Sequence, residues 1–165
     1  MVESFETFYR SFEPQIFGYL WRMCGDEHAA LDMTQETFLR AWQRYVEVCA
    51  YQRPDSWLYR VATRLALNHA RQRKRHVRAL GKLQSHELAV SNEAVIESGD
   101  GDAVLQTLQM LATRDRAALV LHSVYGLTCA ELAATLHISE GAAKVLLWRG
   151  RERFRRMYVQ LENDL

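Results

Sequence analysis

The sequence predicts an all-α protein made of two small helical domains joined by a flexible linker, with a helix-turn-helix in the second domain. Its 165 residues include only two prolines, Pro14 and Pro54, and no convincing run alternates apolar with polar residues. Several segments instead repeat apolar residues at helical spacing. A chain of this length with 48% hydrophobic residues fits one ordinary domain or two small ones.

Three helices are expected in the first domain, residues 1–82. The first carries an amphipathic stripe that Pro14 bends or interrupts, formed by Phe5, Phe8, Tyr9, Phe12, Ile16, Leu20 and Met23. The second runs from about Glu27 to Tyr45 and is expected to bury Leu31, Phe38, Trp42 and Tyr45. The third begins at Pro54 and continues into a basic run through Trp57, Leu58, Val61, Ala62 and Leu65.

Residues 83–102 are expected to form an acidic linker. No Lys or Arg occurs between Leu83 and Thr113, and the linker mixes Ser, Asn and Gly with five acidic residues, Glu87, Glu93, Glu97, Asp100 and Asp102. Such a composition is typical of a solvated tether.

The second domain, residues 103–165, ends in a helix-turn-helix with a strongly basic last helix. Before it come two helical patterns, one with Val104, Leu108 and Leu111 and one with Ala117, Val120, Leu121 and Val124. Gly126 can end the second of these, Thr128 can cap a short helix to Leu136, and Ser139 can cap the last helix. On that helix the buried stripe is Ala143, Leu147, Gly150 and Phe154, and the other faces carry Lys144, Arg149, Arg151, Arg153, Arg155 and Arg156. Such a helix fits the major groove of DNA.

A second basic segment strengthens the prediction of a nucleic-acid partner. No acidic residue occurs from Ser56 to His86, while eight cations do: Arg60, Arg64, Arg71, Arg73, Lys74, Arg75, Arg78 and Lys82. Because the net charge of the chain is only +1, its charges are sorted by region, which implies a partner. Within this segment Arg60, Arg64, Asn68, Arg71, Arg75 and Arg78 form one stripe that could follow a DNA backbone. The alternative is a pair of solvated basic helices in an ordinary bundle.

The sequence argues against an exported protein and against an enzyme. The N-terminus lacks a cationic head followed by an apolar run, and no stretch approaches the ~20 apolar residues of a membrane span, so a cytoplasmic protein is expected. The three cysteines, Cys24, Cys49 and Cys129, support neither a disulfide framework nor a zinc site. No nucleophile–base pair or phosphate-binding glycine loop is visible, so we expect no catalytic residue, cofactor or metal.

At three places the residues resemble one family, the extracytoplasmic-function (ECF) sigma factors of bacterial RNA polymerase. Residues 30–42, with the pattern Asp32, Gln35, Glu36, resemble their polymerase-binding helix, and residues 57–62 resemble the start of their promoter-melting helix. Residues 126–151 are similar to their minus-35-reading module. The resemblance covers essentially the whole chain in the right order and spacing.

The resemblance implies a role for several sets of residues. Those that would bind core RNA polymerase are Asp32, Gln35, Glu36, Leu39 and Arg40. Those that would bind the minus-10 element and melted DNA are Tyr51, Gln52, Arg53, Trp57, Arg60, Arg64, Asn68, Arg71 and Arg75, although core packing alone also explains Trp57. Those that would bind the minus-35 element are Thr128, Ser139, Lys144, Trp148, Arg149, Arg151 and Arg153. The implied partners are core RNA polymerase and promoter DNA, and an anti-sigma factor is left open.

The chain departs from the family pattern at positions expected to face DNA. Arg64 stands where the family often has Asn, and Asn68 stands where it often has Asp. In the reading helix the usual Thr-Val-Lys-Ser-Arg becomes Ala142 to Leu146, which removes two hydroxyls and one cation. These changes put the promoter preference in question, because hydroxyls and guanidiniums supply hydrogen bonds to phosphates and bases.

Two other function classes remain open. One is a free-standing helix-turn-helix regulator that binds an operator as a dimer, which would not need the exposed face with Asp32, Gln35 and Glu36. The other is a metal- or thiol-dependent enzyme, which would require Cys24, Cys49 or Cys129 to converge in a pocket.

Overall fold

The structure is a computed structural model, and it describes residues 3–81 and 100–164. Within these ranges the chain forms eight helices and no strand: α1 (Phe5–Cys24), α2 (Glu27–Gln43), α3 (Tyr45–Val48), α4 (Pro54–Gly81), α5 (Asp100–Met110), α6 (Thr113–Ser123), α7 (Cys129–Leu136) and α8 (Glu140–Asn163). The all-α prediction is confirmed. Most of the expected acidic linker lies outside the described residues, and its last three residues belong to α5.

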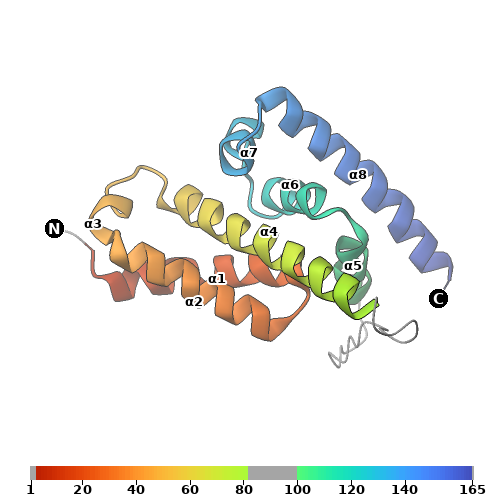
Figure 1. Cartoon of the computed structure of the whole chain (residues 1–165). Helices are drawn as coiled ribbons and strands as arrows, with labels where there is room; N and C mark the ends of the chain where they lie inside the picture. The colour runs from red at the N-terminus through yellow and green to blue at the C-terminus, as the bar shows by residue number, and fades with distance from the viewer. Residues whose placement is uncertain (1–2, 82–99, 165) are drawn as a thin grey trace.

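The first helical group is a bundle in which α1, α2 and α4 pack pairwise (Figure 1). Ser4 caps α1, whose stripe is buried or half-buried as predicted, and Gly25 ends it with a φ of 67°. The expected interruption at Pro14 does not occur, because α1 runs through this residue as one helix. α4 begins at Pro54, where the missing N–H costs no helical hydrogen bond. The short helix α3 was not predicted.

The core stripe of α2 differs from the predicted one. Phe38 is buried, but Leu31 and Trp42 are 39% and 59% exposed, so the prediction that these two are core residues is wrong. The buried side of α2 is formed instead by Ala30, Met33, Thr34, Thr37 and Ala41, all of them small except Met33. Small residues let α2 approach α1 and α4 closely. The two threonine hydroxyls donate to the carbonyls of Ala30 and Met33 at 2.7 Å, so they bring no unpaired polar group into the core.

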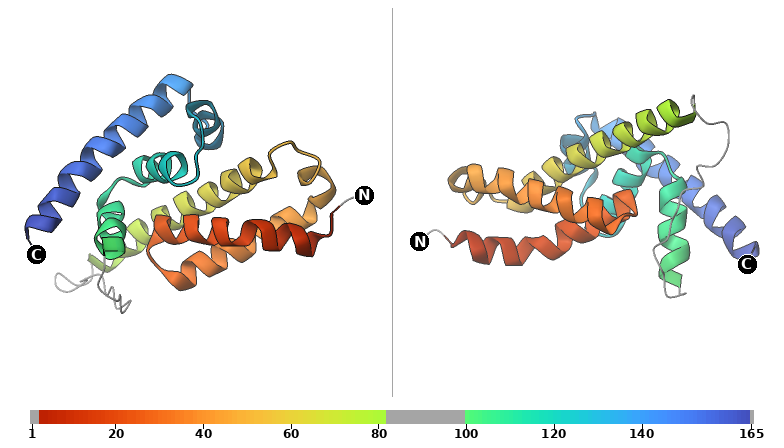
Figure 2. Two further views of the ribbon diagram at one scale, coloured as in Figure 1. Left: turned by 180° about the vertical axis from the view of Figure 1, so that it is seen from behind. Right: turned by 60° about the horizontal axis from the view of Figure 1, so that its bottom comes forward.

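The second group holds the helix-turn-helix on α5 and α6. Thr128 caps α7 reciprocally with Glu131, and Ser139 caps α8 by accepting from the amide of Ala142 at 3.1 Å. Gly126 has a φ of 71°, which fits its predicted place in the turn after α6. Ala143, Leu147 and Gly150 of α8 are buried as predicted, and Phe154 is half-buried. Figure 2 shows α8 along the outer side of this group, turned away from α2.

The two groups are packed against each other through a buried arginine. Arg116 of α6 donates to the carbonyls of Leu108, Gln109 and Leu111 at 2.6 to 3.0 Å and to that of Met23. These carbonyls lie at the C-terminal ends of α5 and α1, where a cation is favourable. Gln109 also donates to the carbonyl of Arg22 at 2.9 Å. The second group therefore closes the C-terminal end of α1.

Aromatic rings and one ion pair extend this contact. Tyr19 of α1, Tyr59 of α4 and Tyr125, which follows α6, have ring centroids 5.4 to 6.0 Å apart. Arg53, just before α4, binds Glu131 of α7 at 2.7 Å. The helical groups thus share one continuous core in this structure.

Candidate nucleic-acid interface

The polar face of α2 is exposed, as the sequence predicts. Asp32 and Gln35 are exposed and Leu39 is 50% exposed, while Glu36 forms an ion pair with Arg40 at 2.8 Å. Within the described part of the chain Asp32 has no ion pair. Such a face offers an unpaired carboxylate and an amide beside an apolar side chain, which suits a protein partner with cationic and apolar groups.

Two large apolar residues enlarge the α2 face. Leu31 and Trp42, expected in the core, are exposed on the same helix. The Trp42 ring rests edge-on against Phe5, with centroids 4.9 Å apart, so contact with α1 holds it in place. In the sequence, the side of α2 that packs against other helices is indicated by its small residues, Ala30, Thr34, Thr37 and Ala41. We call Leu31, Asp32, Gln35, Glu36, Leu39, Arg40 and Trp42 the α2 face.

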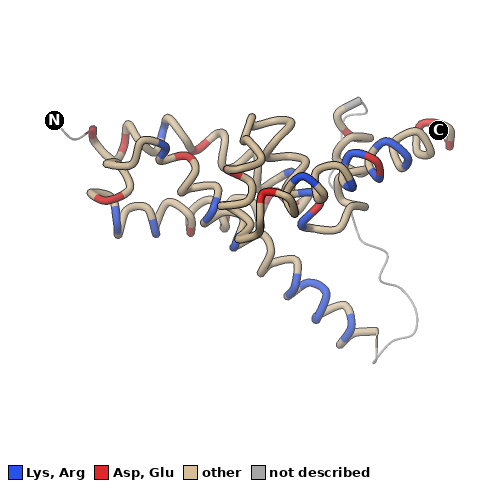
Figure 3. The backbone as a smooth tube through the Cα atoms, turned by 90° about the horizontal axis from the view of Figure 1, so that it is seen from above, with Lys and Arg blue, Asp and Glu red and all other residues tan. Residues whose placement is uncertain are grey.

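The basic stripe of α4 is exposed along its whole length. Arg60, Arg64, Asn68, Arg71 and Arg75 are all exposed, and every residue from Arg71 to Ala79 is exposed. Figure 3 shows this half of α4 projecting from the body of the molecule, with Lys and Arg along it and no acidic residue. From Arg60 onward the stripe can therefore approach a polyanion without a competing carboxylate on this part of α4, since the acidic residue of the helix, Asp55, lies in its first turn and pairs with Arg53.

The residues before α4 differ in their availability. Gln52 is exposed, and Tyr51 is 40% exposed and donates its hydroxyl hydrogen to Glu47, which raises the pKa of Tyr51. Arg53 is held by two carboxylates, Asp55 and Glu131, and its hydrogen bonds to Asp55 are the main reason that its pKa is raised. Trp57 is half-buried and packs on the core. In this structure, then, Tyr51 and Gln52 are accessible, whereas Arg53 is paired.

The start of α8 presents an exposed surface. Trp148 is 66% exposed and Val145 is 59% exposed, and Lys144 pairs only at 3.8 Å with the exposed Glu140. Thr128 and Ser139 are exposed, but their hydroxyls are engaged as helix caps. Val145, which replaces a usual hydroxyl of the family pattern, thus gives this surface an apolar strip beside Lys144 and Trp148. Apolar side chains in the major groove contact the thymine methyl group.

Two of the predicted cations of α8 are bound within the protein. Arg149 donates to both carboxylate oxygens of Asp115 at 2.7 to 3.1 Å, and Arg153 donates to the same carboxylate at 3.2 Å. The hydrogen bond and the attraction to Asp115 raise the pKa of Arg149. Both arginines lie off the buried stripe, as the sequence predicts, and their side chains are 43% and 47% exposed although they pair with Asp115. Arg151, Arg155 and Arg156 are also exposed. Sequence reasoning missed Asp115 altogether.

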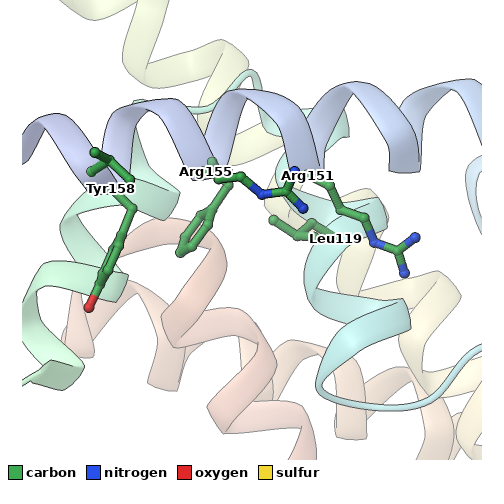
Figure 4. A pocket seen from close by; sticks show the side chains of 6 residues that line it. Leu119, Arg151, Arg155 and Tyr158 are labelled. Carbon is green, nitrogen blue, oxygen red and sulfur yellow. The ribbon is translucent and has the colours of Figure 1, made fainter.

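Further along α8, Arg151 and Arg155 border a pocket of about 380 Å³. The other lining residues are Leu119, Phe154, Tyr158 and Val159. Figure 4 shows both arginines on the same side of α8, with Leu119 of α6 facing them. Among the described residues no group of three His, Cys, Asp or Glu side chains could hold a metal ion, and none of the described helices has the length and hydropathy of a membrane span.

Two family models match the two helical groups. Residues 8–76 match Sigma-70 region 2, and residues 101–154 match Sigma-70, region 4. The solved sigma factor RpoE, in complex with the anti-sigma factor NepR from Bartonella quintana, has a TM-score of 0.72 at 22% identity and covers 93% of this chain and 95% of that one. CnrH, in complex with the cytosolic domain of CnrY, has a TM-score of 0.61 at 20% identity, and the match covers 98% of this chain and 89% of CnrH. These two likenesses concern the fold.

Several bacterial sigma factors are similar to this chain in sequence. The RNA polymerase sigma factor CarQ of Myxococcus xanthus is 31% identical over 167 residues, which cover 99% of this chain and 94% of that protein. The ECF sigma factor SigW of Bacillus subtilis is 26% identical, and the match covers 96% of this chain and 91% of SigW. SigE of Mycolicibacterium smegmatis is 30% identical over 93% of this chain, but the match covers only 61% of SigE. With both sigma regions matched in order and CarQ matched along nearly its whole length, the chain belongs to the ECF sigma factors of bacterial RNA polymerase.

Proposed function

We propose that this chain is the promoter-recognising subunit of a bacterial RNA polymerase. It binds the core enzyme through the α2 face, reads the minus-35 element with α7 and α8, and binds and helps to open the minus-10 region with α4. The role is one of binding and positioning, since the chemistry of RNA synthesis belongs to the core enzyme. Membership of the ECF sigma family supports the general role, and the exposed surfaces supply the finer assignments.

The observation that carries the proposal is the α2 face. The side chains of Trp42 and Leu39 are 59% and 50% exposed. They lie on the same helix as Asp32, which has no ion pair among the described residues. Apolar side chains of this size gathered on one helix mark a protein-binding surface. A free-standing repressor that meets only DNA and a second copy of itself does not need an acidic surface of this kind, because acidic groups repel phosphates.

The DNA-reading role of α8 is supported by its exposed first half. Lys144, Val145 and Trp148 face solvent and are held by a capped helix packed on α7. A rigid helix with its N-terminal side chains exposed is the geometry by which a helix-turn-helix reads base edges. We assign Lys144 and Arg151 to phosphate or base contacts, and Thr128 and Ser139 to positioning of the two helices through their caps.

The minus-10 role is assigned to α4 and the loop before it. The cationic stripe Arg60, Arg64, Arg71 and Arg75, with Asn68, would track one strand, while Tyr51 and Gln52 would meet an unstacked base. Arg53 would join them only after leaving Glu131. Trp57 contributes chiefly by packing, since it is half-buried against the core.

An anti-sigma protein is a further proposed partner. RpoE and CnrH were solved in complexes with NepR and with the cytosolic domain of CnrY, and the former is named as an anti-sigma factor. A protein of this class would compete with core polymerase, so it would reduce capture of the chain by the core enzyme. Such competition is the measurable sign of this partner.

The experiment that tests the proposed function has two steps. The tagged full chain is incubated with purified core RNA polymerase, and the reconstituted enzyme then transcribes a library of random upstream sequences. We expect stoichiometric capture and recovery of promoters that share two separated elements. Failure of capture, or tight binding of one palindromic site by the chain alone as a dimer, would replace this function with that of an operator-binding regulator.

A further inference from the structure

The carboxylate of Asp115 lies at the point where the reading helix crosses α6. The side chain has 0% exposure and stands in the first turn of α6. Both of its oxygens accept a hydrogen bond from Nε of Arg149 at 3.1 Å, and one of them also accepts from Nη2 of Arg149 at 2.7 Å. The other oxygen also accepts from Nη1 of Arg153 at 3.2 Å. A buried carboxylate therefore joins two arginines of α8 that are one helical turn apart.

The helices approach unusually closely at this crossing. A Cβ atom added to Gly150 would lie 3.1 Å from the carbonyl oxygen of Asp115, so the glycine is the residue that permits the contact. Gly150 stands directly beside Arg149 in the sequence and is buried. The backbone contact sets the distance between α6 and α8, and the flanking ion pairs oppose rotation or sliding of α8. Together they fix the direction in which Lys144, Val145 and Trp148 project.

The two arginines are only partly used by this pairing. Their side chains remain 43% and 47% exposed, and a guanidinium carries five N–H donors. The bonds to Asp115 engage Nε and Nη2 of Arg149 and Nη1 of Arg153. Nη1 of Arg149 and Nη2 of Arg153 stay available to an anion. Two guanidiniums and one carboxylate also leave a net charge of +1 where two free arginines would give +2.

We propose that Asp115 is a positioning residue for promoter recognition. It holds Arg149 and Arg153 as a preorganised pair that receives one DNA phosphate, it fixes the reading helix, and it reduces the charge available for sequence-independent binding. The inference rests on the proposed function, because it names the device behind the minus-35 contact. Asp115 itself does not touch DNA.

An ordinary structural ion pair would behave differently from such a positioning device. Loss of a structural pair lowers stability and weakens binding to every duplex alike. Loss of a positioning carboxylate frees a cation, so the affinity for duplex DNA of any sequence rises while the preference for one sequence falls. The dependence of binding on salt separates these cases, because each phosphate neutralised on duplex DNA changes the log–log slope by about 0.9.

The test compares Asp115→Asn with the unaltered chain in two assays. In the first, the full chain alone binds a fluorescent duplex of scrambled sequence over a salt series. We expect the slope to steepen by up to about 0.9 and affinity at low salt to rise. In the second, the enzyme reconstituted with core polymerase binds a duplex bearing an upstream element recovered from the random library. We expect its preference over the scrambled duplex to fall about tenfold, as for loss of one good contact.

A second pair of variants keeps the charge constant, and it also serves if Asp115→Asn folds poorly by circular dichroism. Arg149→Lys keeps the cation but loses the fork that grips both oxygens of Asp115. We expect lower preference for the recovered element with an unchanged slope on the scrambled duplex. Arg155→Lys is the matched control, since Arg155 lies on the same helix and its exposed side chain pairs with the half-buried Glu152 at 3.2 Å. We expect Arg155→Lys to change neither the preference for the recovered element nor the salt slope on the scrambled duplex.

The outcomes distinguish the inference from the function on which it rests. If the unaltered enzyme shows no preference for the recovered element, both fail. If it shows that preference and Asp115→Asn or Arg149→Lys retains it in full, the positioning role of Asp115 is overturned while the proposed function stands. A uniform loss of affinity on both duplexes, with the slope unchanged, assigns Asp115 a structural role only and also overturns the inference.

Discussion

At the scale of single residues, the arginines of α8 divide into two kinds. Arg149 and Arg153 neutralise a carboxylate with 0% exposure, whereas Arg155 and Arg156 stand on the surface. A surface ion pair contributes little to stability, but a buried carboxylate that loses its partners is strongly destabilising. Equal changes of charge on one helix should therefore have unequal effects on folding.

We expect Arg149→Ala combined with Arg153→Ala to lower the thermal midpoint of the chain by about 5 °C or more, because Asp115 stays buried without a cation. The control, Arg155→Ala combined with Arg156→Ala, removes the same charge and should shift the midpoint by about 1 °C or less. Thermal unfolding followed by circular dichroism measures both. Equal midpoints for the two double variants would contradict this account of Asp115.

The residue scale also shows what the sequence could reveal. The caps at Thr128 and Ser139 and the turn at Gly126 were predicted correctly, because each depends on neighbours within three or four residues. Asp115 and Arg116 were not recognised, because their partners lie on other elements: Arg149 is 34 positions from Asp115, and Met23 is 93 positions from Arg116. Periodicity carries no signal for such distant pairs.

Among the elements, α2 buries a different stripe from the predicted one. Large apolar residues were expected inside, but close packing against α1 and α4 selected Ala30, Thr34, Thr37 and Ala41 and left Leu31 and Trp42 outside. The polar residues of the α2 face were exposed as predicted. The unexpected tryptophan makes this face larger than the sequence indicated.

Asp32→Ala combined with Glu36→Ala should weaken capture by core polymerase about tenfold or more while helicity stays unchanged, because both carboxylates lie on the exposed side of α2. Co-purification with core enzyme and circular dichroism measure the two quantities. Glu3→Ala combined with Glu6→Ala, which removes two exposed carboxylates from the region of α1, is the matched control. Unchanged capture of the α2 double variant would rule out the assigned interface.

The two basic elements should have separable tasks. Arg60→Ala combined with Arg64→Ala should lower permanganate reactivity of thymines near the start site even where the minus-35 footprint persists, since both arginines lie on α4. Arg151→Ala should instead weaken the upstream footprint, because Arg151 is an exposed cation of α8. Each lost phosphate contact should reduce the log–log salt slope by about one unit. Normal melting by the α4 variant would contradict this division.

At the scale of the whole molecule, the two helical groups were predicted but their contact was not. The sequence indicated two modules on a tether, and composition says nothing about how such modules dock. In the structure Arg116 and Gln109 close the end of α1, and the rings of Tyr19, Tyr59 and Tyr125 meet between the groups. Each of these residues is unremarkable in its own segment, so only the folded chain reveals the interface.

The tyrosine cluster predicts loss of stability in alkaline solution. Burial raises the pKa of Tyr19 and of Tyr59 above their ordinary value of about 10. The folded chain therefore retains phenol protons that the unfolded chain loses, so this contribution is complete below about pH 10 and falls as pH rises further. Tyr19→Phe combined with Tyr59→Phe should flatten that alkaline fall, as followed by thermal midpoints across a pH series. The same pH dependence in the variant would exclude the cluster as its origin.

We propose that this chain directs core RNA polymerase to open promoters, and permanganate footprinting of a recovered promoter tests this role. Four samples are compared: DNA alone, DNA with the chain, DNA with core enzyme, and DNA with both proteins. We expect reactive thymines near the start site only when both proteins are present, together with protection of the upstream element. No reactivity with both proteins, or an upstream footprint by a dimer of the chain alone, would contradict it.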